Sequence, residues 1–424
     1  MKNGSIIRIE FTTKIVQKLI FILAISILLS LNNSFSACKN FIPGEGSLSL
    51  DTLEKKTGMS SGQNVRVVFW NVENLYDTYD DTTKFDNEFT SQGLMRWNYK
   101  RFHIKLNHVA KTLMAIGTWE PPGIVGLCEV ENRFVMNKLI WDSPLKPFGY
   151  RMIHHESPDL RGIDVALLYL PSKFRVLCSK PYKIDFPFDT AARTREILFV
   201  KGQVFGGDTL NILINHWPSR RGGYAESQPR RDYVAYVLRR LIDSLLAGGP
   251  YANILVMGDF NDEPGSSSIT NILHALPPDS LKNTGDLINL MCPFSGRQGS
   301  HRYKGIWSLL DQFIVSASLL KHAGGLRLVP GSVGIFWGTF LLKEDRKYFG
   351  DKPFRTYNGL RYEGGFSDHL PVYLDLVTDG HHKSPSCIPR PGYRRAPQMT
   401  REHIFKVQQK QPQPHTGCIM SIHH

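Results

Sequence analysis

Short apolar runs recur along most of the chain, and their lengths are those of β-strands. Each run holds five to seven residues, is rich in branched and aromatic side chains, and is bounded mostly by polar, Gly or Pro residues. This pattern is typical of strands that are buried within a sheet. It predicts strands at residues 65–70, 124–128, 165–170, 198–204, 210–215, 254–258, 311–315 and 370–376.

Two longer segments carry apolar residues three and four positions apart, which is helical spacing. The spacing predicts one helix at 99–116 and a second at 231–247, which Gly248-Gly249-Pro250 ends. Strands that alternate irregularly with helices indicate an α/β sandwich of mixed sheets rather than a regular series of βαβ units.

The first 37 residues have the pattern of an export signal. Basic residues precede an apolar run at 19–31, and small residues follow it. The run is shorter than the roughly 20 residues that a membrane-spanning helix needs. Phe35-Ser36-Ala37-Cys38 resembles a lipoprotein box, in which Cys38 would carry a lipid anchor, but ordinary cleavage after Ser36 explains the same residues. We therefore expect a periplasmic, secreted or lipid-anchored protein.

The charge of the chain is concentrated at its two ends. The formal net charge is +13, of which +3 precedes Cys38 and +6 follows Asp379, so that +4 remains for the body. We expect a polar linker at 38–62, one folded domain at 63–379 and a disordered basic tail at 380–424. A body this mildly basic does not by itself indicate nucleic-acid binding.

The cysteines argue against a zinc site built from thiolates. None of the six sits in a paired spacing such as Cys-x-x-Cys. Cys128 and Cys178 lie in apolar runs, so we expect both side chains to be buried.

Polar residues of the types used in phosphoryl chemistry stand at the ends of the predicted strands. A sheet edge can present such residues to a single crevice. Taken singly, each has a structural explanation: Asp259 and Asn261 suit a turn, and His369 suits a hydrogen-bonded core position. Their conjunction predicts a site. Its candidate residues are Asn71, Glu129, His216, Asp259, Asn261, Asp311, Asp368 and His369.

Taken in chain order, the segments that carry these candidate residues resemble the endonuclease/exonuclease/phosphatase superfamily, whose members are similar to deoxyribonuclease I. The resemblance covers residues 65–376, and its most specific pieces are Gly258-Asp259-Phe260-Asn261 and Ser367-Asp368-His369-Leu370-Pro371-Val372. It implies a four-layer α/β sandwich of two packed mixed β-sheets flanked by helices. It also implies a hydrolase of phosphoester bonds that uses Mg²⁺ or Mn²⁺.

The resemblance also implies roles for the candidate residues. Asn71, Glu129 and Asp368 correspond to the metal site, while Asp259 and Asn261 orient the attacking water. Asp311 corresponds to the carboxylate that holds a catalytic histidine, His369, and His216 to a second histidine. Hydrolysis needs an in-line water, compensation of phosphate charge and help for the leaving group. The sequence leaves open which histidine does which.

The sequence leaves more than one substrate class open. Arg195 is a candidate to bind phosphate, although it could instead form a surface ion pair, and Arg355, in the insertion before Ser367, could face the substrate. A nuclease or phosphodiesterase is the leading hypothesis, and a phospholipid or small phosphate ester hydrolase is the alternative. The intact set of acidic residues and histidines argues against a binding protein without activity. An exposed hairpin with paired aromatic residues would favour a lipid substrate, and Ile335-Phe336-Trp337 is the only candidate for one. No obligate protein partner is indicated.

Overall fold

The computed structural model describes residues 63–321 and 325–378, all of which belong to one compact unit, Ser61–His424. The predicted export signal at 1–37, the linker at 38–62 and the tail at 380–424 lie outside the described residues. Within the described part of the chain, no helix is long and apolar enough to cross a membrane.

Two mixed β-sheets form the centre of this unit. The first has the strand order β14-β20-β1-β2-β4-β3, with β15 beside β20, and the second has the order β5-β6-β7-β8-β13-β10-β9. Strands β1 and β2 are parallel, as are β7 and β8. The strands of the first sheet are β1 (Gln63–Leu75), β2 (Ile124–Val130), β3 (Arg151–His154), β4 (Asp164–Tyr169), β14 (Leu326–Leu328), β15 (Gly334–Ile335) and β20 (Val372–Thr378). Those of the second are β5 (Phe174–Tyr182), β6 (Ile197–Val204), β7 (Thr209–His216), β8 (Ile254–Asp259), β9 (Ala275–Leu276), β10 (Leu287–Asn289) and β13 (Asp311–Ser316).

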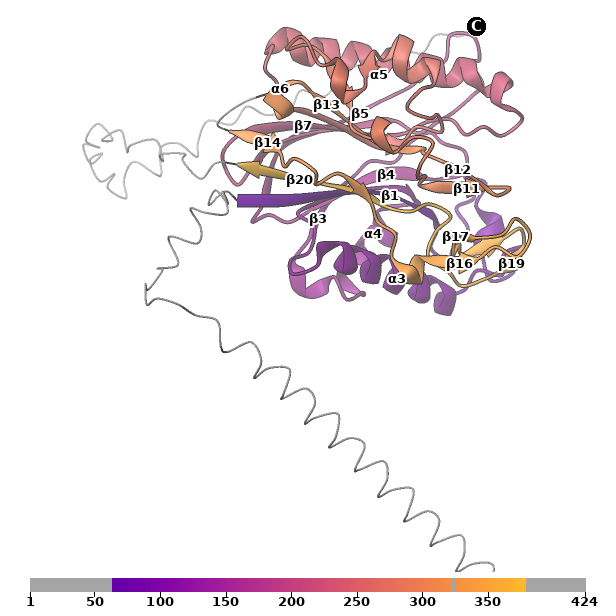
Figure 1. The fold of residues 1–424 in the computed structure, drawn as a ribbon. Helices are drawn as coiled ribbons and strands as arrows, with labels where there is room; N and C mark the ends of the chain where they lie inside the picture. The colour runs from indigo at the N-terminus through magenta and orange to yellow at the C-terminus, as the bar shows by residue number, and fades with distance from the viewer. Residues whose placement is uncertain (1–62, 322–324, 379–424) are drawn as a thin grey trace, which may run out of the picture. The chain divides into compact units, whose positions relative to one another are not determined.

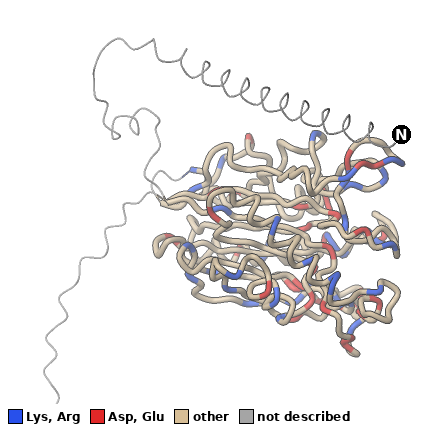
Figure 2. Tube along the Cα trace, turned by 90° about the horizontal axis from the view of Figure 1, so that it is seen from below, with Lys and Arg blue, Asp and Glu red and all other residues tan. Residues whose placement is uncertain are grey.

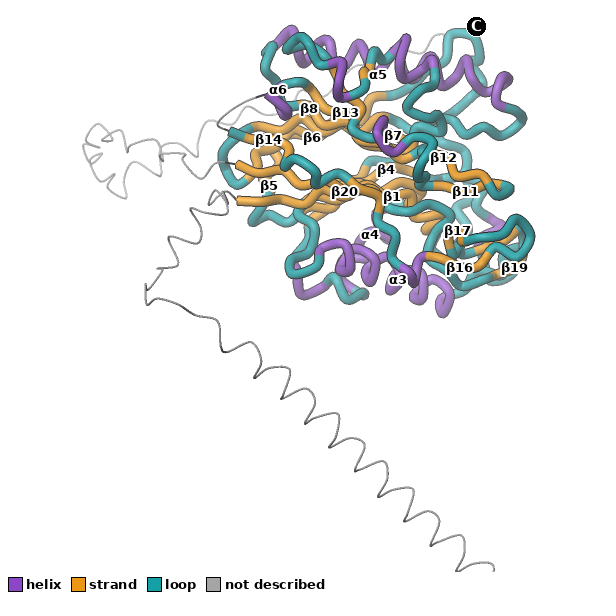
Figure 3. Tube along the Cα trace, in the orientation of Figure 1, coloured by secondary structure: helices purple, strands orange, loops and turns teal. Residues whose placement is uncertain are grey.

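The sheets pack face to face, and helices cover their outer faces (Figures 1 and 3). Helices α3 (Tyr99–Gly117) and α4 (Arg133–Trp141) lie on the first sheet, and α5 (Tyr224–Gly248) lies on the second. The short α6 (Ser318–Lys321) follows β13. The fold is therefore the expected four-layer α/β sandwich.

The central strands are buried on both faces, which explains why they read as continuous apolar runs rather than as alternating ones. The two sheets approach closely at Gly126 in β2. A Cβ atom at this position would lie 2.8 Å from the Cε atom of Met257 in β8. A larger residue at 126 would therefore have to displace the end of the Met257 side chain, which shows how closely the two sheets pack here.

All eight predicted strands and both predicted helices are present, with two differences. Helix α5 begins at Tyr224, seven residues before the predicted start, and contains Pro229 within it. The apolar pattern becomes regular only after this proline. The expectation that Cys178 is buried is wrong: its side chain is exposed. Cys178 lies in β5, which forms the edge of the second sheet, so that only part of that strand is covered.

Three small hairpins stand outside the two sheets: β11 (His301–Tyr303) with β12 (Ile306–Ser308), β16 (Leu342–Glu344) with β17 (Asp351–Pro353), and β18 (Tyr357–Asn358) with β19 (Arg361–Tyr362). The candidate aromatic hairpin for a lipid surface is not exposed. Ile335 is buried in β15, while Phe336 and Trp337 are half-buried and pack against the core. Trp337 also contacts the ring of Trp307. This segment therefore contributes to the core, which removes the argument for a lipid substrate that it offered.

Candidate active site

The ends of three neighbouring strands of the second sheet form one row of polar side chains. In the strand register, His216 of β7 pairs with Asp259 of β8, and Asp259 pairs with Asp311 of β13. Residues that pair directly across neighbouring strands lie side by side in the sheet. All three are buried. The sheet thus aligns residues that are far apart in sequence.

Irregular backbone at the ends of β1 and β2 places polar residues of the first sheet beside this row. Asn71 pairs with Cys128, and the register of both strands shifts just beyond this pair. Glu129 follows at φ 61°, and Glu73 and Asn261 have φ values of 52° and 50°. Such left-handed conformations are uncommon in residues other than glycine, and they often occur at functional sites. We call Asn71, Glu129, His216, Asp259, Asp311 and His369 the strand-end cluster.

His369 is held in a fixed orientation by Asp311. The Nδ1 atom of His369 lies 2.6 Å from Oδ2 of Asp311. The His369 backbone is also fixed, because its N–H donates to Oγ of Ser367 and its carbonyl accepts from Nε1 of Trp70. Burial alone would lower the pKa of His369, but the carboxylates of Asp311 and Asp259 outweigh it and hold this pKa well above its usual value. The hydrogen bond to Asp311 and the nearby carboxylates thus favour the protonated imidazole.

The carboxylate of Asp259 lies at the centre of the cluster. Its Oδ2 atom is 3.0 Å from Nδ2 of Asn71, 3.7 Å from Nε2 of His216 and 3.8 Å from Nε2 of His369. Its Oδ1 atom accepts a hydrogen bond from the backbone N–H of Asn261. Burial raises the pKa of Asp259. Asp259 is thus an oriented carboxylate with increased basicity.

His216 differs from His369 in its environment. Its Nε2 atom is 3.8 Å from Oε1 of Glu129, and its buried Nδ1 has no hydrogen-bond partner. Burial and the nearby charges of Arg195 and Arg161 hold the pKa of His216 well below its usual value. The cluster therefore combines one charged and one neutral imidazole, a separation that the sequence could not assign.

Arg355, a candidate phosphate ligand, lies between two carboxylates of the site. Its Nε atom is 3.1 Å from Oε1 of Glu73, and a terminal nitrogen is 2.9 Å from Oδ2 of Asp368. Burial would raise the pKa of Asp368, but Arg355 lowers it to about 2. Burial and the charge of Asp368 raise the pKa of Glu73 to about 7. Arg355 and Asp368 also line a pocket of about 290 Å³.

Three site residues were missed as functional candidates. Glu73 stands two positions after the candidate Asn71, at the end of the same strand, so a signal for it was present. Lys105 of α3 is buried, with Nζ 2.6 Å from Oγ1 of Thr356, and burial lowers its pKa to about 8. His301 of β11 contacts the ring of His369, and burial lowers its pKa to about 4. Neither Lys105 nor His301 belongs to a motif, so only the fold could identify them.

Three groups of side chains in the described residues could hold a metal ion; one of them, His154, Glu156 and Asp164, includes no residue of the strand-end cluster, and the other two share His369. His301, Asp368 and His369 form one of these two, and Asp259, Asp311 and His369 form the other, each with ligand atoms within 4.8 Å of one another. Glu129 belongs to none of the three groups, and Asn71 directs its Oδ1 to the backbone N–H of Glu73. The metal roles of Asn71, Glu129 and Asp368 thus stay predictions.

The donor set nevertheless fits a hard divalent cation. Glu129 forms no ion pair with Lys or Arg among the described residues, and the buried Oδ1 of Asp311 has no hydrogen-bond partner. Mg²⁺ and Mn²⁺ prefer oxygen ligands, and one or two carboxylates suffice to bind Mg²⁺. Carboxylate oxygens without a protein cation are the atoms that such an ion would contact.

Comparison with known proteins assigns this arrangement to a family. The model of the Endonuclease/Exonuclease/phosphatase family matches residues 66–378, which contain the whole strand-end cluster. The chain belongs to this family. It is accordingly a hydrolase that acts on phosphoester bonds. None of the curated proteins matches the chain.

Members of this family with solved structures are distantly similar to the chain. A family protein from Bacteroides thetaiotaomicron is 14% identical with a TM-score of 0.47, and the match covers 76% of this chain and 98% of that one. The mannosyl-6-phosphatase of the same organism is 14% identical with a TM-score of 0.46, covering 74% and 99%. The human Nocturnin catalytic domain is 17% identical with a TM-score of 0.45, covering 74% and 94%. The assignment to the family rests on the sequence match.

Arg195, the other candidate phosphate ligand, lies behind the cluster rather than in it. The side chain is buried, with one terminal nitrogen 3.1 Å from Oδ2 of Asp159 and the other 2.6 Å from the carbonyl oxygen of Trp217. Nδ2 of Asn261 donates to the same carbonyl at 3.1 Å. One backbone oxygen therefore connects Arg195 to the site.

Proposed function

We propose that the protein is a phosphodiesterase, with nucleic acid as the leading substrate class, that hydrolyses its substrate by metal-assisted in-line attack of water. The observation that carries the proposal is the arrangement around Asp259. An oriented, buried carboxylate faces a charged imidazole held by Asp311 and a neutral imidazole at His216. This combination offers one group that can accept a proton and one that can compensate negative charge.

Asp259 is the group that we assign to the attacking water. Its raised pKa makes it a stronger base than an exposed aspartate, and its Oδ1 is fixed by the Asn261 backbone. In the reaction, Asp259 holds the water and accepts its proton as the new phosphorus–oxygen bond forms. The bond to the leaving oxygen then breaks, and that oxygen is protonated by solvent.

His369 is the group that we assign to the phosphate. Because Asp311 keeps the imidazole charged, Nε2 can donate to a non-bridging oxygen as negative charge develops there. His216 stays uncharged and adds a contact without a second positive charge beside it. These roles follow from the opposite pKa directions of the two histidines.

A divalent cation completes the proposal. Glu129 and Asp368 would hold Mg²⁺ or Mn²⁺, with Asn71 beside them. When bound, the ion supplies further charge compensation for the phosphate and stabilisation of the leaving oxygen. The surplus of carboxylates at the site supports this part of the proposal.

The proposal is tested with purified protein, supplied with Mg²⁺ or Mn²⁺, on substrates of different classes. The set is bis(p-nitrophenyl) phosphate, p-nitrophenyl phosphate, plasmid DNA, RNA and sphingomyelin. We expect both the simple diester and a nucleic acid to be hydrolysed faster than the monoester. Hydrolysis of the monoester alone would contradict the phosphodiesterase proposal.

We also propose that the protein acts outside the cytoplasm, because the pattern at residues 1–37 is that of an export signal. The mature N-terminus, measured by mass spectrometry after expression in a bacterium, tests this. A lipid on Cys38 or a start at Ala37 would each support export and would distinguish the two cleavage alternatives. A chain that keeps residues 1–37 and stays in the cytoplasm would contradict it.

A further inference from the structure

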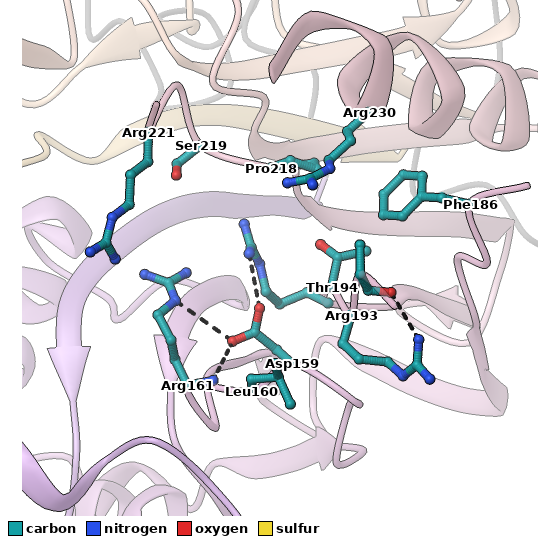
Figure 4. Close-up of a pocket in the computed structure, with 12 residues that line it drawn as sticks. Asp159, Leu160, Arg161, Phe186, Arg193, Thr194, Pro218, Ser219, Arg221 and Arg230 are labelled. Carbon is teal, nitrogen blue, oxygen red and sulfur yellow. Dashed lines mark hydrogen bonds and ion pairs between the residues drawn. The ribbon is translucent and has the colours of Figure 1, made fainter. Parts of the chain in front are cut away.

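A pocket rich in arginine is formed partly by residues that neighbour Trp217 in the chain and by Arg195, which binds the Trp217 carbonyl (Figure 4). Its volume is about 270 Å³, close to the lower end of the roughly 300–1,000 Å³ range of small-molecule sites. Loops from both sheets form it: Asp159 and Arg161 precede β4, while Arg193 precedes β6 and Arg221 follows β7. We call this site the arginine pocket.

The charges of the arginine pocket are not balanced. Five arginines line it, and their acidic partners are Asp159 in the pocket and Asp189 beside it. Two carboxylates against five guanidinium groups leave a net charge of +3. The five are Arg161, Arg193, Arg195, Arg221 and Arg230. Along the trace as a whole, basic and acidic residues are interspersed (Figure 2).

Arg193 and Arg221 carry most of the surplus. Arg193 donates only to the backbone carbonyls of Thr190 and Ala192. Arg221 forms no ion pair within residues 63–321 and 325–378. In Figure 4, Arg161 and Arg221 lie on one side of the pocket and Arg230 on the other. Guanidinium groups that gather without carboxylates repel one another, and an anion between them removes this repulsion.

Two buried polar atoms at the floor of the pocket also lack partners. Oγ1 of Thr194 and Nε of Arg195 have no hydrogen bond, although the two residues are only 3% and 6% exposed. Buried donors are normally satisfied, and one without a partner costs stability. Donors left free in a cationic pocket are the contacts that a bound anion would complete.

The pocket and the cluster share one loop. The carbonyl of Trp217 accepts from both Arg195 and Asn261, and Nε of Arg220 donates to the carbonyl of Asn261 at 2.7 Å. The next residues, Pro218, Ser219 and Arg221, line the pocket. A substrate bound at the cluster can therefore extend along residues 217–221 into the pocket.

We propose that the arginine pocket binds a second phosphate group of the substrate whose first phosphate is hydrolysed at the strand-end cluster. This inference rests on the proposed phosphodiesterase function and narrows its substrate. The substrate is a molecule with at least two phosphate groups, from an oligonucleotide or from a multiply phosphorylated small molecule. The guanidinium groups recognise the phosphate itself, which both sources share.

The test compares a dinucleotide with and without an additional phosphate. KM is measured for thymidylyl-thymidine and for its 5′-phosphorylated form, and inositol monophosphate and bisphosphate are compared as inhibitors of bis(p-nitrophenyl) phosphate hydrolysis. The wild type is assayed beside an Arg193→Ala/Arg221→Ala variant. An Arg240→Ala/Arg346→Ala variant is the matched control, because it loses the same charge from exposed positions outside the pocket.

We expect the wild type to prefer the additional phosphate by about tenfold or more in KM or in inhibition constant, as charge-assisted hydrogen bonds imply. The pocket variant should lose this preference, and the control should keep it. Loss of preference with the dinucleotides identifies an oligonucleotide source, and loss with the inositol phosphates identifies a small molecule.

An enzyme that hydrolyses bis(p-nitrophenyl) phosphate but shows no preference for the additional phosphate would overturn the inference and leave the proposed function intact. A preference that survives in the pocket variant would overturn it equally. An enzyme that hydrolyses no diester would instead contradict the proposed function.

Discussion

The strand-end cluster and the arginine pocket share residues 217–221 but are built in opposite ways. The cluster stands at the ends of regular strands, carries a surplus of carboxylates, and fixes its side chains through buried hydrogen bonds. The pocket is formed mainly by loops, carries a surplus of guanidinium groups, and offers Arg193 and Arg221 no ion pair within the described part of the chain. Precise orientation serves bond breaking, while accumulated charge serves binding. Changes in the cluster should therefore lower kcat, and changes in the pocket should raise KM.

Removal of divalent cations should have the largest effect. The carboxylates of the cluster need a cation for the substrate phosphate to approach them, so EDTA should abolish hydrolysis and excess Mg²⁺ or Mn²⁺ should restore it. Initial rates on bis(p-nitrophenyl) phosphate before and after chelation measure this. Full hydrolysis after exhaustive EDTA treatment would rule out the metal requirement.

Loss of the His369 imidazole should have the next largest effect. We expect His369→Ala to lower kcat by roughly 10² or more, as loss of acid–base or charge-compensating groups does. Asp311→Asn should act in the same direction, and the double variant should lose less than the sum because the two residues act as a unit. Circular dichroism of each variant controls for folding. Near wild-type kcat in a folded His369→Ala enzyme would transfer this role to His216.

Arg195, at the floor of the arginine pocket, should contribute to the stability of the fold rather than to kcat. Arg195→Ala leaves the buried carboxylate of Asp159 with Arg161 alone, at 3.6 Å. We expect a loss of about 3 kcal/mol in the free energy of unfolding, the lower end for a broken buried ion pair. Urea denaturation measures this, and Arg193→Ala, which breaks no ion pair, is the control. Equal stability of the two variants would contradict the description of Arg195 as part of the buried floor.

The pH dependence of kcat should report on the cluster alone. Asp311 raises the pKa of His369, so the charged imidazole is lost only as pH rises through this raised value. Asp311→Asn removes a raising charge and should therefore move the alkaline decline of kcat to lower pH. The Arg193→Ala/Arg221→Ala variant should decline where the wild type does. An unmoved profile in Asp311→Asn would show that His369 is not the titrating group.

The sequence predicted the regular parts of the molecule better than the irregular ones. Strands buried on both faces leave continuous apolar runs, which is why β7, β8 and β13 could be located closely, whereas β1 extends five residues beyond its predicted end. The start of α5 was misplaced because Pro229 interrupts its pattern. The exposure of Cys178 depends on the place of β5 at the sheet edge, which periodicity alone does not reveal.

The same division holds for the site. Asp259, Asp311 and His369 could be predicted because each follows or precedes a strand within a recognisable motif. Their register, the bulged conformation at Glu129 and the contact of His301 with His369 arise only from tertiary packing. Arg195 of the arginine pocket was a candidate phosphate ligand, but the gathering of five arginines could not be predicted, because they come from separate loops.

The most direct test of the division between chemistry and binding is one set of steady-state constants. The kcat and KM of wild type, His369→Ala and Arg193→Ala/Arg221→Ala are measured on the same 5′-phosphorylated dinucleotide with saturating Mg²⁺. We expect His369→Ala to lower kcat by roughly 10² with little change in KM. The arginine variant should raise KM by about tenfold, with the smaller change in kcat. A fall in kcat of the same size in both variants, or a change confined to KM in His369→Ala, would contradict the account.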